Sequence, residues 1–211
     1  MTPLINSIAH SIFSPSRRIS YSGLLKRFGY MMLFILTISI WGCEPIIETP
    51  FERFTIPKDK HYSTYRVELL ESSSLIFNAT FDESVVYECQ TIENQWDTNK
   101  LFGFSDCNSA HHENSARFGW RWINKRIEII AYCYVNGERI IEYIGSTQPF
   151  KTNSYEIQLT DTHYIFRFDN ETMEIPRAKP CDTGAYYLLF PYFGGNETAP
   201  HDIHIMINRI Y

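Results

Sequence analysis

After Cys43 the sequence has no stretch in which apolar residues recur every three or four positions, as they would in an amphipathic helix. It also has no glycine-rich phosphate loop, no Gly-x-Ser-x-Gly nucleophile elbow and no Cys-x-x-Cys pair. A helical bundle, a nucleotide-dependent phosphotransferase, an α/β-hydrolase and a zinc ribbon are therefore excluded as interpretations of this chain. We expect no cofactor.

Positive charge is scarce downstream of Cys43. All four basic residues that precede Cys43 (Arg17, Arg18, Lys26 and Arg27) lie in a segment without acids. Removal of that segment would leave 15 basic and 24 acidic side chains, which changes the formal charge from -5 to -9. Such a chain repels polyphosphates, so we expect no nucleic-acid partner. Glycans, peptides, cations and other proteins remain open as ligands.

The first 43 residues have the order of parts found in an export signal. A basic stretch is followed by an apolar run at residues 31–41, which is too short to span the roughly 30 Å hydrocarbon core of a bilayer. Ile40-Trp41-Gly42-Cys43 resembles the lipobox of bacterial lipoproteins, in which the cysteine is lipidated and becomes the new terminus. We predict a signal peptide at residues 1–42 and lipidation of Cys43; the alternative is an uncleaved signal anchor.

Residues 43–62 are predicted to be a lipid-anchored linker. Pro45, Pro50 and Pro57 punctuate a stretch without clear periodicity, which favours an extended chain. Acyl chains on Cys43 would hold the protein at a membrane, so the partner at this end is a bilayer. Glu44 differs from the aspartate associated with inner-membrane retention, and this favours the outer membrane of the cell envelope.

From about residue 65 the hydrophobic periodicity is two, which indicates β-strands. Residues 127–135 alternate, Asn136-Gly137 suits a type I′ turn, and residues 139–144 return as the second strand of a hairpin. A second hairpin is predicted to join residues 155–159 to residues 164–168 through Asp161-Thr162. Further strands are expected at 65–70, 75–81, 117–122, 174–177, 186–190 and 203–207. Residues 63–211 are therefore predicted to form one all-β domain, an antiparallel β-sandwich of the jelly-roll or concanavalin-like kind.

Four cysteines remain after Cys43, and export to an oxidising compartment would allow disulfides among Cys89, Cys107, Cys133 and Cys181. Cys133 falls on the apolar face of a strand and could equally be a buried free thiol. Oxygen and imidazole ligands gather at Asp106, His111, His112 and Glu113. Because the spacing matches no known cation loop, we expect no metal there and a solvated loop instead.

Residues 117–122 alternate between arginine and aromatic side chains. If the aromatics face the core, Arg117 and Arg121 lie on the outer surface near Tyr132 and Tyr134. Rings that stack on sugar faces and guanidinium groups that reach hydroxyls or carboxylates are typical of sugar recognition. The alternative is a sandwich core with ordinary surface cations. The ligand-binding residues predicted from this pattern and from the loop at 191–202 are Arg117, Trp120, Arg121, Tyr132, Tyr134, Tyr192 and His201.

Three segments carry a resemblance to a known family: residues 99–106 (NKLFGFSD), 115–122 (SARFGWRW) and 191–202 (PYFGGNETAPHD). Together they resemble a family of lipoproteins and secreted domains from Bacteroidetes-type bacteria, over roughly residue 75 to the C-terminus. The resemblance implies export and a β architecture, and it implies no activity. In outline the pattern is also similar to concanavalin-like sandwiches, which include lectins and jelly-roll polysaccharide lyases, although the lyases' Gln-x-His strand is absent.

Two functions follow as expectations. The first is a non-catalytic glycan-binding or scaffold module at the cell envelope, whose partner is a glycan or another envelope protein. The alternative is a polysaccharide lyase acting on a uronic-acid polymer. In that enzyme Tyr132, Tyr134 or His201 would abstract a proton and Arg117 or Arg121 would neutralise the uronate.

Overall fold

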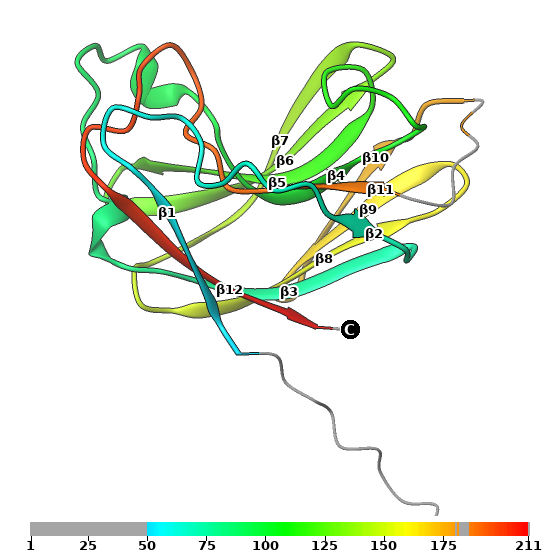
Figure 1. Ribbon diagram of the computed structural model, residues 1–211, viewed down its shortest axis with the longest axis horizontal. Coiled ribbons are helices and arrows are strands. Elements are labelled where there is room, and N and C mark those ends of the chain that lie inside the picture. The colour runs from blue at the N-terminus through cyan, green and yellow to red at the C-terminus, as the bar shows by residue number, and fades with distance from the viewer. Residues whose placement is uncertain (1–49, 180, 182–185, 211) are drawn as a thin grey trace, which may run out of the picture. The chain divides into compact units, whose positions relative to one another are not determined.

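The computed structural model describes residues 50–179, 181 and 186–210, and these form two six-stranded antiparallel sheets that pack face to face (Figure 1). Sheet A has the order β1 (Glu52–Ile56), β12 (Ile203–Ile210), β3 (Ser74–Phe81), β8 (Thr152–Leu159), β9 (His163–Phe168), β10 (Glu171–Pro176). Sheet B has the order β2 (Leu69–Leu70), β11 (Tyr186–Leu189), β4 (Asn99–Ser105), β5 (Ser115–Ile123), β6 (Arg126–Val135), β7 (Glu138–Thr147). The predicted all-β sandwich is confirmed.

Both predicted hairpins are present. Residues Asn136 and Gly137 have φ angles of 53° and 82°, the positive values that a type I′ turn requires, and they join β6 to β7. Asn124 and Lys125 have φ angles of 52° and 57° and join β5 to β6 in the same way. Strands β8 and β9 pair from Leu159 and Tyr164 onward. The unbroken register of β5 and β6 fixes which of their side chains share a face, whereas the register of β6 and β7 shifts between Ile129 and Ile130.

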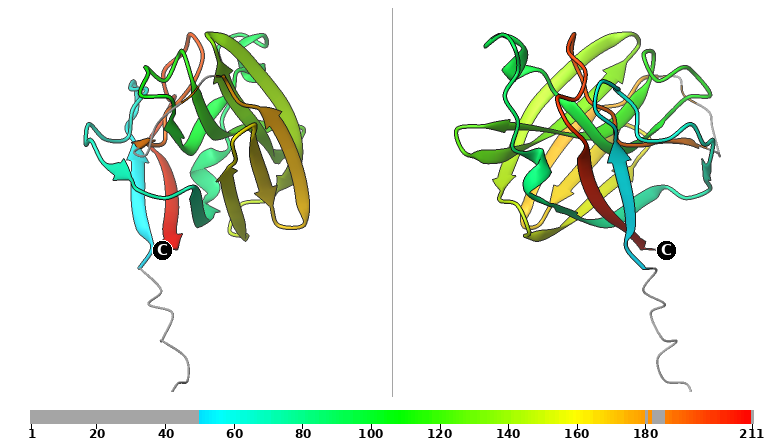
Figure 2. Two further views of the ribbon diagram at one scale, coloured as in Figure 1. Left: turned by 90° about the vertical axis from the view of Figure 1, so that its right-hand side faces the viewer. Right: turned by 60° about the vertical axis from the view of Figure 1, so that its left-hand side comes forward.

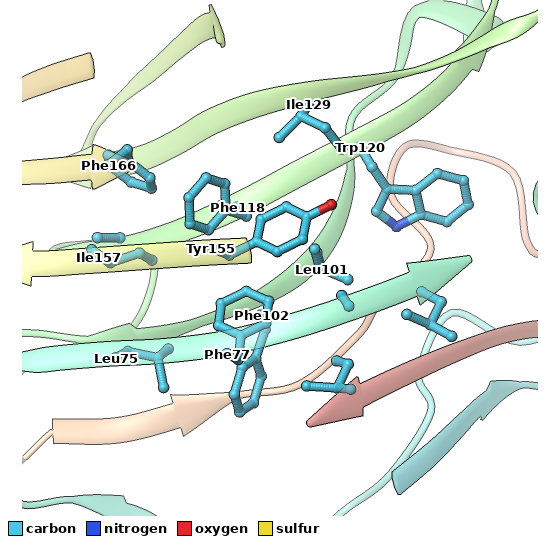
Figure 3. Packing of buried hydrophobic residues seen from close by; sticks show 14 of the residues in the cluster. Leu75, Phe77, Leu101, Phe102, Phe118, Trp120, Ile129, Tyr155, Ile157 and Phe166 are labelled. Atoms are coloured by element: carbon cyan, nitrogen blue, oxygen red, sulfur yellow. The ribbon is translucent and has the colours of Figure 1, made fainter. Parts of the chain in front are cut away.

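The core lies between the sheets and is rich in aromatic rings (Figure 3). Phe77 of β3 stacks on Tyr155 of β8 with ring centroids 4.9 Å apart. Phe118 of β5 contacts Tyr155 edge to face at 5.0 Å and Phe166 of β9 at 5.1 Å. Each ring buries a large apolar area, and edge-to-face pairs add about 0.5–1.5 kcal/mol each. These contacts bind sheet B to sheet A.

Strand β1 corrects the predicted extent of the linker. Residues Glu52–Ile56 pair with β12 in sheet A, and Phe54 and Ile56 are buried in the core. Both views of Figure 2 show β1 beside β12. The alternation of Phe54 and Ile56 is too short to stand out between prolines, so the segment appeared unstructured in the sequence. Cys43 and the predicted signal peptide lie outside the described residues.

Helical structure in the described part of the chain is limited to two 3-10 turns, η1 (Glu83–Val85) and η2 (Asn94–Trp96). No helix among those residues has the length and apolar content needed to cross a bilayer.

Candidate functional site

The outer face of sheet B, which points away from the core, carries the polar half of strands β5 and β6. On β5, Phe118 and Trp120 point into the core, so Arg117 points outward. Arg117 lies opposite Tyr132 in the register of β5 and β6, and the rings of Tyr132 and Tyr134 are 5.9 Å apart. Of the two orientations that the sequence left open for β5, the structure has the one in which Phe118 and Trp120 face inward.

Lys100 of β4 and Tyr192 add to this face. The two residues exchange backbone hydrogen bonds: Lys100 N donates to Tyr192 O at 2.8 Å, and Tyr192 N donates to Lys100 O at 3.0 Å. Lys100 Nζ lies 4.6 Å from the ring centroid of Tyr132 and 5.9 Å from that of Tyr192. The ammonium group therefore lies between two phenol rings.

Two histidines complete the group from the loop between β4 and β5. The rings of His111 and His112 are 3.9 Å apart, and His112 lies edge to face with Tyr134 at 5.4 Å. The loop is held in place because Ser115 Oγ donates to the carbonyl of His111 at 2.7 Å. We call the set the Arg117 cluster; its members are Lys100, His111, His112, Arg117, Tyr132, Tyr134 and Tyr192.

Glycines at two positions make room for these side chains. A Cβ atom on Gly103 would lie 2.6 Å from Cγ of Arg117, its neighbour across strands β4 and β5. A Cβ on Gly194 would lie 2.7 Å from Lys100 Nζ and 2.1 Å from the carbonyl oxygen of Thr98. Any larger residue would displace Arg117 or Lys100. At Gly194 the backbone therefore approaches Thr98 and Lys100 closely.

Arg117 is buried without an anionic partner. Its exposed fraction is 6%, Nε makes no hydrogen bond, and its guanidinium group makes no ion pair with any residue that the structure describes. The guanidinium carbon lies 5.6 Å from the ring centroid of Tyr132, and this cation–π contact is its main compensation. Burial lowers the pKa of Arg117 to about 10, and the neighbouring tyrosines oppose that shift. A buried, unpaired cation is costly and calls for an anion.

The pKa values of two neighbours of Arg117, Lys100 and His111, are also lowered. Burial, followed by the charge of Arg117, lowers the pKa of Lys100 to about 8. Burial and then Arg117, His112 and Lys100 lower the pKa of His111 to about 4. At neutral pH His111 is thus uncharged, while Arg117 and much of Lys100 remain cationic.

A surface groove reaches this cluster. It has a volume of about 230 Å³ and runs between the segment before β2 and the end of β11. Its lining residues are Tyr62, Thr64, Arg66, His111, Arg117, Leu188, Leu189, Phe190, Pro191 and Tyr192. The groove offers a guanidinium group, an imidazole and phenol rings along one wall, which is a composition suited to an acidic sugar.

Of the predicted ligand-binding residues, Arg117, Tyr132, Tyr134 and Tyr192 converge, and three others do not join them. Trp120 has an exposed fraction of 0% and packs on Phe81 at 5.3 Å, so its predicted contact with a ligand is corrected to a core role. Arg121 lies four residues along β5 and bonds to Glu128. His201 lies outside the cluster, with Nε2 2.7 Å from the carbonyl oxygen of Ser84.

The four weak metal candidates are separated in the same way. Asp106 is fully buried and serves a structural ion pair, with Oδ2 2.6 Å from Arg177 Nε and 2.8 Å from the Tyr164 hydroxyl. His111 and His112 belong to the Arg117 cluster, and Glu113 is exposed. Cys107 and Cys181 also lie near Asp106, but their sulfur atoms are joined in a disulfide.

The other two cysteines of the domain are free thiols. Cys133 is buried, as its position on the apolar face of β6 suggested, and Cys89 is half-buried.

Lys100 was absent from the site predicted by sequence reasoning. A β-bulge between Lys100 and Phe102 puts both Leu101 and Phe102 into the core, so strict alternation fails in β4. The sequence feature that could have revealed Lys100 as a site residue is the segment 99–103, in which a lysine and a glycine stand among core residues. His111 and His112 were considered only as metal ligands, because only the folded loop shows that His112 contacts Tyr134 and that His111 packs against His112.

No protein-family model matches the sequence, and no curated protein matches it. Among solved structures, the chain is similar to the alginate lyase AlyC3, with a TM-score of 0.53, 10% identity, and 76% of this chain and 74% of that chain covered. A polysaccharide lyase of family 18 gives 0.49 at 8% identity, covering 79% and 88% of the two chains. An endo-β-1,3(4)-glucanase of family GH16 gives 0.47 at 11% identity, covering 68% and 60%. The similarity to AlyC3 shows the fold of this chain, a β-sandwich of the jelly-roll or concanavalin-like kind.

Proposed function

We propose that the outer face of sheet B binds an acidic polysaccharide and that a uronate carboxylate is held at the Arg117 cluster. The observation that carries this proposal is the buried guanidinium group of Arg117, which has an unpartnered Nε and no ion pair within the described residues. A carboxylate would supply the missing partner, and the planar fork of arginine matches carboxylate geometry.

The neighbours of Arg117 suit the remainder of a sugar ring. The ring of Tyr192, which is 38% exposed, offers an apolar face to a pyranose and its hydroxyl group can bond to the polar edge of the sugar, whereas Tyr132 is buried against Lys100 and Arg117. Lys100 adds a second positive charge within reach of Tyr132. Since the domain as a whole is acidic, attraction of a polyanion depends on this local concentration of positive charge.

Affinity electrophoresis through gels that contain a soluble polysaccharide tests this proposal. We expect alginate or polygalacturonate to retard the protein and a neutral β-glucan to retard it much less. Arg117→Met should abolish the retardation by polyuronates, and Arg53→Ala, which removes an exposed cation from sheet A, should preserve it. Equal retardation of Arg117→Met and the unaltered protein would overturn the proposal.

A second candidate function is β-elimination on the bound polyuronate. The specific observation is that a neutral imidazole, His111, lies in the same groove as Arg117, and that burial and the Tyr134 hydroxyl raise the pKa of Tyr132 to about 12. With the carboxylate neutralised by Arg117, His111 would accept the C5 proton of the uronate. The C4–O bond would break, its oxygen would take the Tyr132 proton, and a C4=C5 double bond would form.

The similarity to an alginate lyase makes alginate the first polymer to test for this activity. Ultraviolet absorbance of the unsaturated product should appear with alginate, pectate or a glycosaminoglycan and should be lost in Tyr132→Phe. Retardation of these polymers without any such absorbance would leave a binding module and remove the lyase.

The attachment of the protein to the cell envelope is a separate part of the proposal. Residues 31–43 support a signal peptide and lipidation at Cys43, which would hold the domain at the outer membrane, where it meets extracellular polysaccharide or another envelope protein. Mass spectrometry of the mature protein should find a lipidated Cys43 at the N-terminus. An unmodified thiol at Cys43, or an uncleaved leader, would contradict it.

A further inference from the structure

Trp96 is a large aromatic side chain that the structure leaves half in solvent, with an exposed fraction of 53%. It ends the turn η2 (Asn94–Trp96), and its ring lies 5.0 Å from the guanidinium carbon of Arg121 on β5. Arg121 is four residues along β5 from Arg117, a separation of about 13 Å in an extended strand. The indole therefore lies near the same face of sheet B, some distance from the Arg117 cluster.

The turn that carries Trp96 is fixed by side-chain hydrogen bonds. Gln95 Oε1 accepts from Cys89 N at 2.9 Å, and Gln95 Nε2 donates to the carbonyl oxygen of Trp122 at 2.7 Å. Asn94 Nδ2 donates to Glu197 at 2.5 Å. Because the turn is already rigid, it loses little conformational entropy when a ligand stacks on its exposed aromatic ring.

One side of the indole is already covered. Arg121 Nη1 donates to the carbonyl oxygen of Trp96 at 3.1 Å, and Arg121 Nε donates to Glu128 at 2.9 Å. Arg126 also bonds to Glu128 at 2.9 Å, so the charge of Arg121 is shared in a small network. Arg121 thus acts as a positioning residue that supports the ring from one face, and the solvent-exposed part of the ring is left for a ligand.

The charges around Trp96 differ from those of the Arg117 cluster. Glu93 and Asp97 flank η2 in the chain, and Glu197 accepts hydrogen bonds from Asn94 and from the backbone of Gln90 and Thr91. These carboxylates would repel a uronate. A neutral sugar, whose apolar face can stack on an indole, suits the position better.

We propose that Trp96 forms a second subsite, which stacks on a neutral pyranose of the same glycan chain that places a uronate at Arg117. That a single glycan chain occupies both positions rests on the proposed function. The neutral-sugar subsite at Trp96 can be tested without it. The ligand would then be a polysaccharide with both acidic and neutral residues.

Intrinsic fluorescence is a suitable measurement, because Trp120 is fully buried and Trp122 is partly buried, whereas Trp96 is exposed. Titration of the full domain with cellohexaose, xylohexaose and mannohexaose should shift or quench the emission for at least one of these neutral probes. Because Trp96→Ala and Trp96→Tyr lack the reporting indole, their affinities are measured by isothermal titration: Trp96→Ala should weaken the binding at least tenfold, and Trp96→Tyr should retain most of it.

The matched control is Ile92→Ala, which removes a more exposed apolar side chain, 72% exposed, from the same loop without removing an aromatic plane. It should bind as the unaltered protein does. No fluorescence response to any of the three probes, or equal losses in Trp96→Ala and Ile92→Ala, would overturn the subsite. Polyuronate binding that survives Arg117→Met would instead overturn the proposed function, so the two failures can be distinguished.

Discussion

Arg117 is buried at a cost to stability, and the proposed function gives that burial a role in recognition. Its neighbours Phe118 and Ala116 pack in the core, yet its own guanidinium is buried on the opposite face, 5.6 Å from the Tyr132 ring that Lys100 Nζ also contacts. Elsewhere in β5 the buried positions hold uncharged residues, as the hydrophobic pattern predicts, whereas at Arg117 a charged residue is buried. Such a disagreement is expected at binding sites, where a ligand completes the arrangement.

Two tyrosines of the core allow a paired test of hydrogen bonding. The hydroxyl of Tyr155 is buried and unpartnered among the described residues, whereas that of Tyr164 donates to Asp106 at 2.8 Å. Tyr155→Phe should therefore raise the free energy of unfolding by about 1 kcal/mol, and Tyr164→Phe should lower it by a similar amount or more. Urea denaturation measures both. A loss of stability in Tyr155→Phe would show that its hydroxyl has a partner.

Lys100 makes binding depend on pH. Its pKa of about 8 is depressed mainly by burial and next by Arg117; Arg139 lowers it further and Asp97 opposes the shift. Anion binding uses the charged form, so affinity for a polyuronate should fall about tenfold as pH rises through and beyond 8. Isothermal titration on both sides of that pH measures the change, and Lys100→Arg should flatten it.

Stability has the opposite dependence on pH. Below pH 8 Lys100 is charged in the folded and unfolded chain, and the cost of its burial is present in full. Between about 8 and the ordinary lysine pKa of 10.5 only the unfolded chain keeps the proton, so the contribution of Lys100 to the free energy of unfolding increases with pH. A binding profile that rises across this interval would contradict the assignment of Lys100 to the anion site.

At the scale of elements, strands with strict alternation could be predicted from the sequence and irregular ones could not. The hairpin of β6 and β7 followed from alternation and from Asn136-Gly137. Strand β4 was missed because its bulge puts Leu101 and Phe102 on the same side, and β1 was missed because it lies among prolines. Tertiary pairing, rather than local preference, stabilises these two strands.

The disulfide between Cys107 and Cys181 links the β4–β5 loop to a segment 74 residues away. We expect the double change Cys107→Ser, Cys181→Ser to lower the free energy of unfolding by about 2–5 kcal/mol, mainly because the unfolded chain gains freedom. Urea denaturation measures this loss, and Cys89→Ser serves as the control because that thiol is free. An unchanged denaturation midpoint in the double variant would show that the disulfide does not form in solution.

At the scale of the whole molecule, the fold was within reach of sequence reasoning and only part of the site was. Residues on β5 and β6 could be grouped because adjacent strands and a known turn fix their register. The other members of the Arg117 cluster come from distant parts of the chain: Lys100 from β4, the two histidines from a loop, and Tyr192 from the segment after β11. They lie together only because of the order of the strands in the sheet. Hydrophobic periodicity predicts on which face of a strand each side chain lies, but it does not predict the order of the strands in a sheet.

The acidity of the domain also matters at this scale. A chain with more acidic than basic groups gains no general attraction to polyanions, so recognition of a uronate requires the concentrated charge at Arg117 and Lys100. We therefore expect polyuronates to bind only at the Arg117 cluster, and we expect single substitutions there to weaken that binding.

Calorimetric titration of oligomannuronate and oligogalacturonate into the unaltered protein and into Arg117→Met measures whether Arg117 binds a uronate. We predict a measurable affinity for at least one oligouronate that Arg117→Met abolishes, together with an unfolding temperature in the variant that is equal or higher, because an unpaired buried cation has been removed. Identical titrations for the two proteins, or an Arg117→Met variant that unfolds well below the unaltered protein, would contradict it.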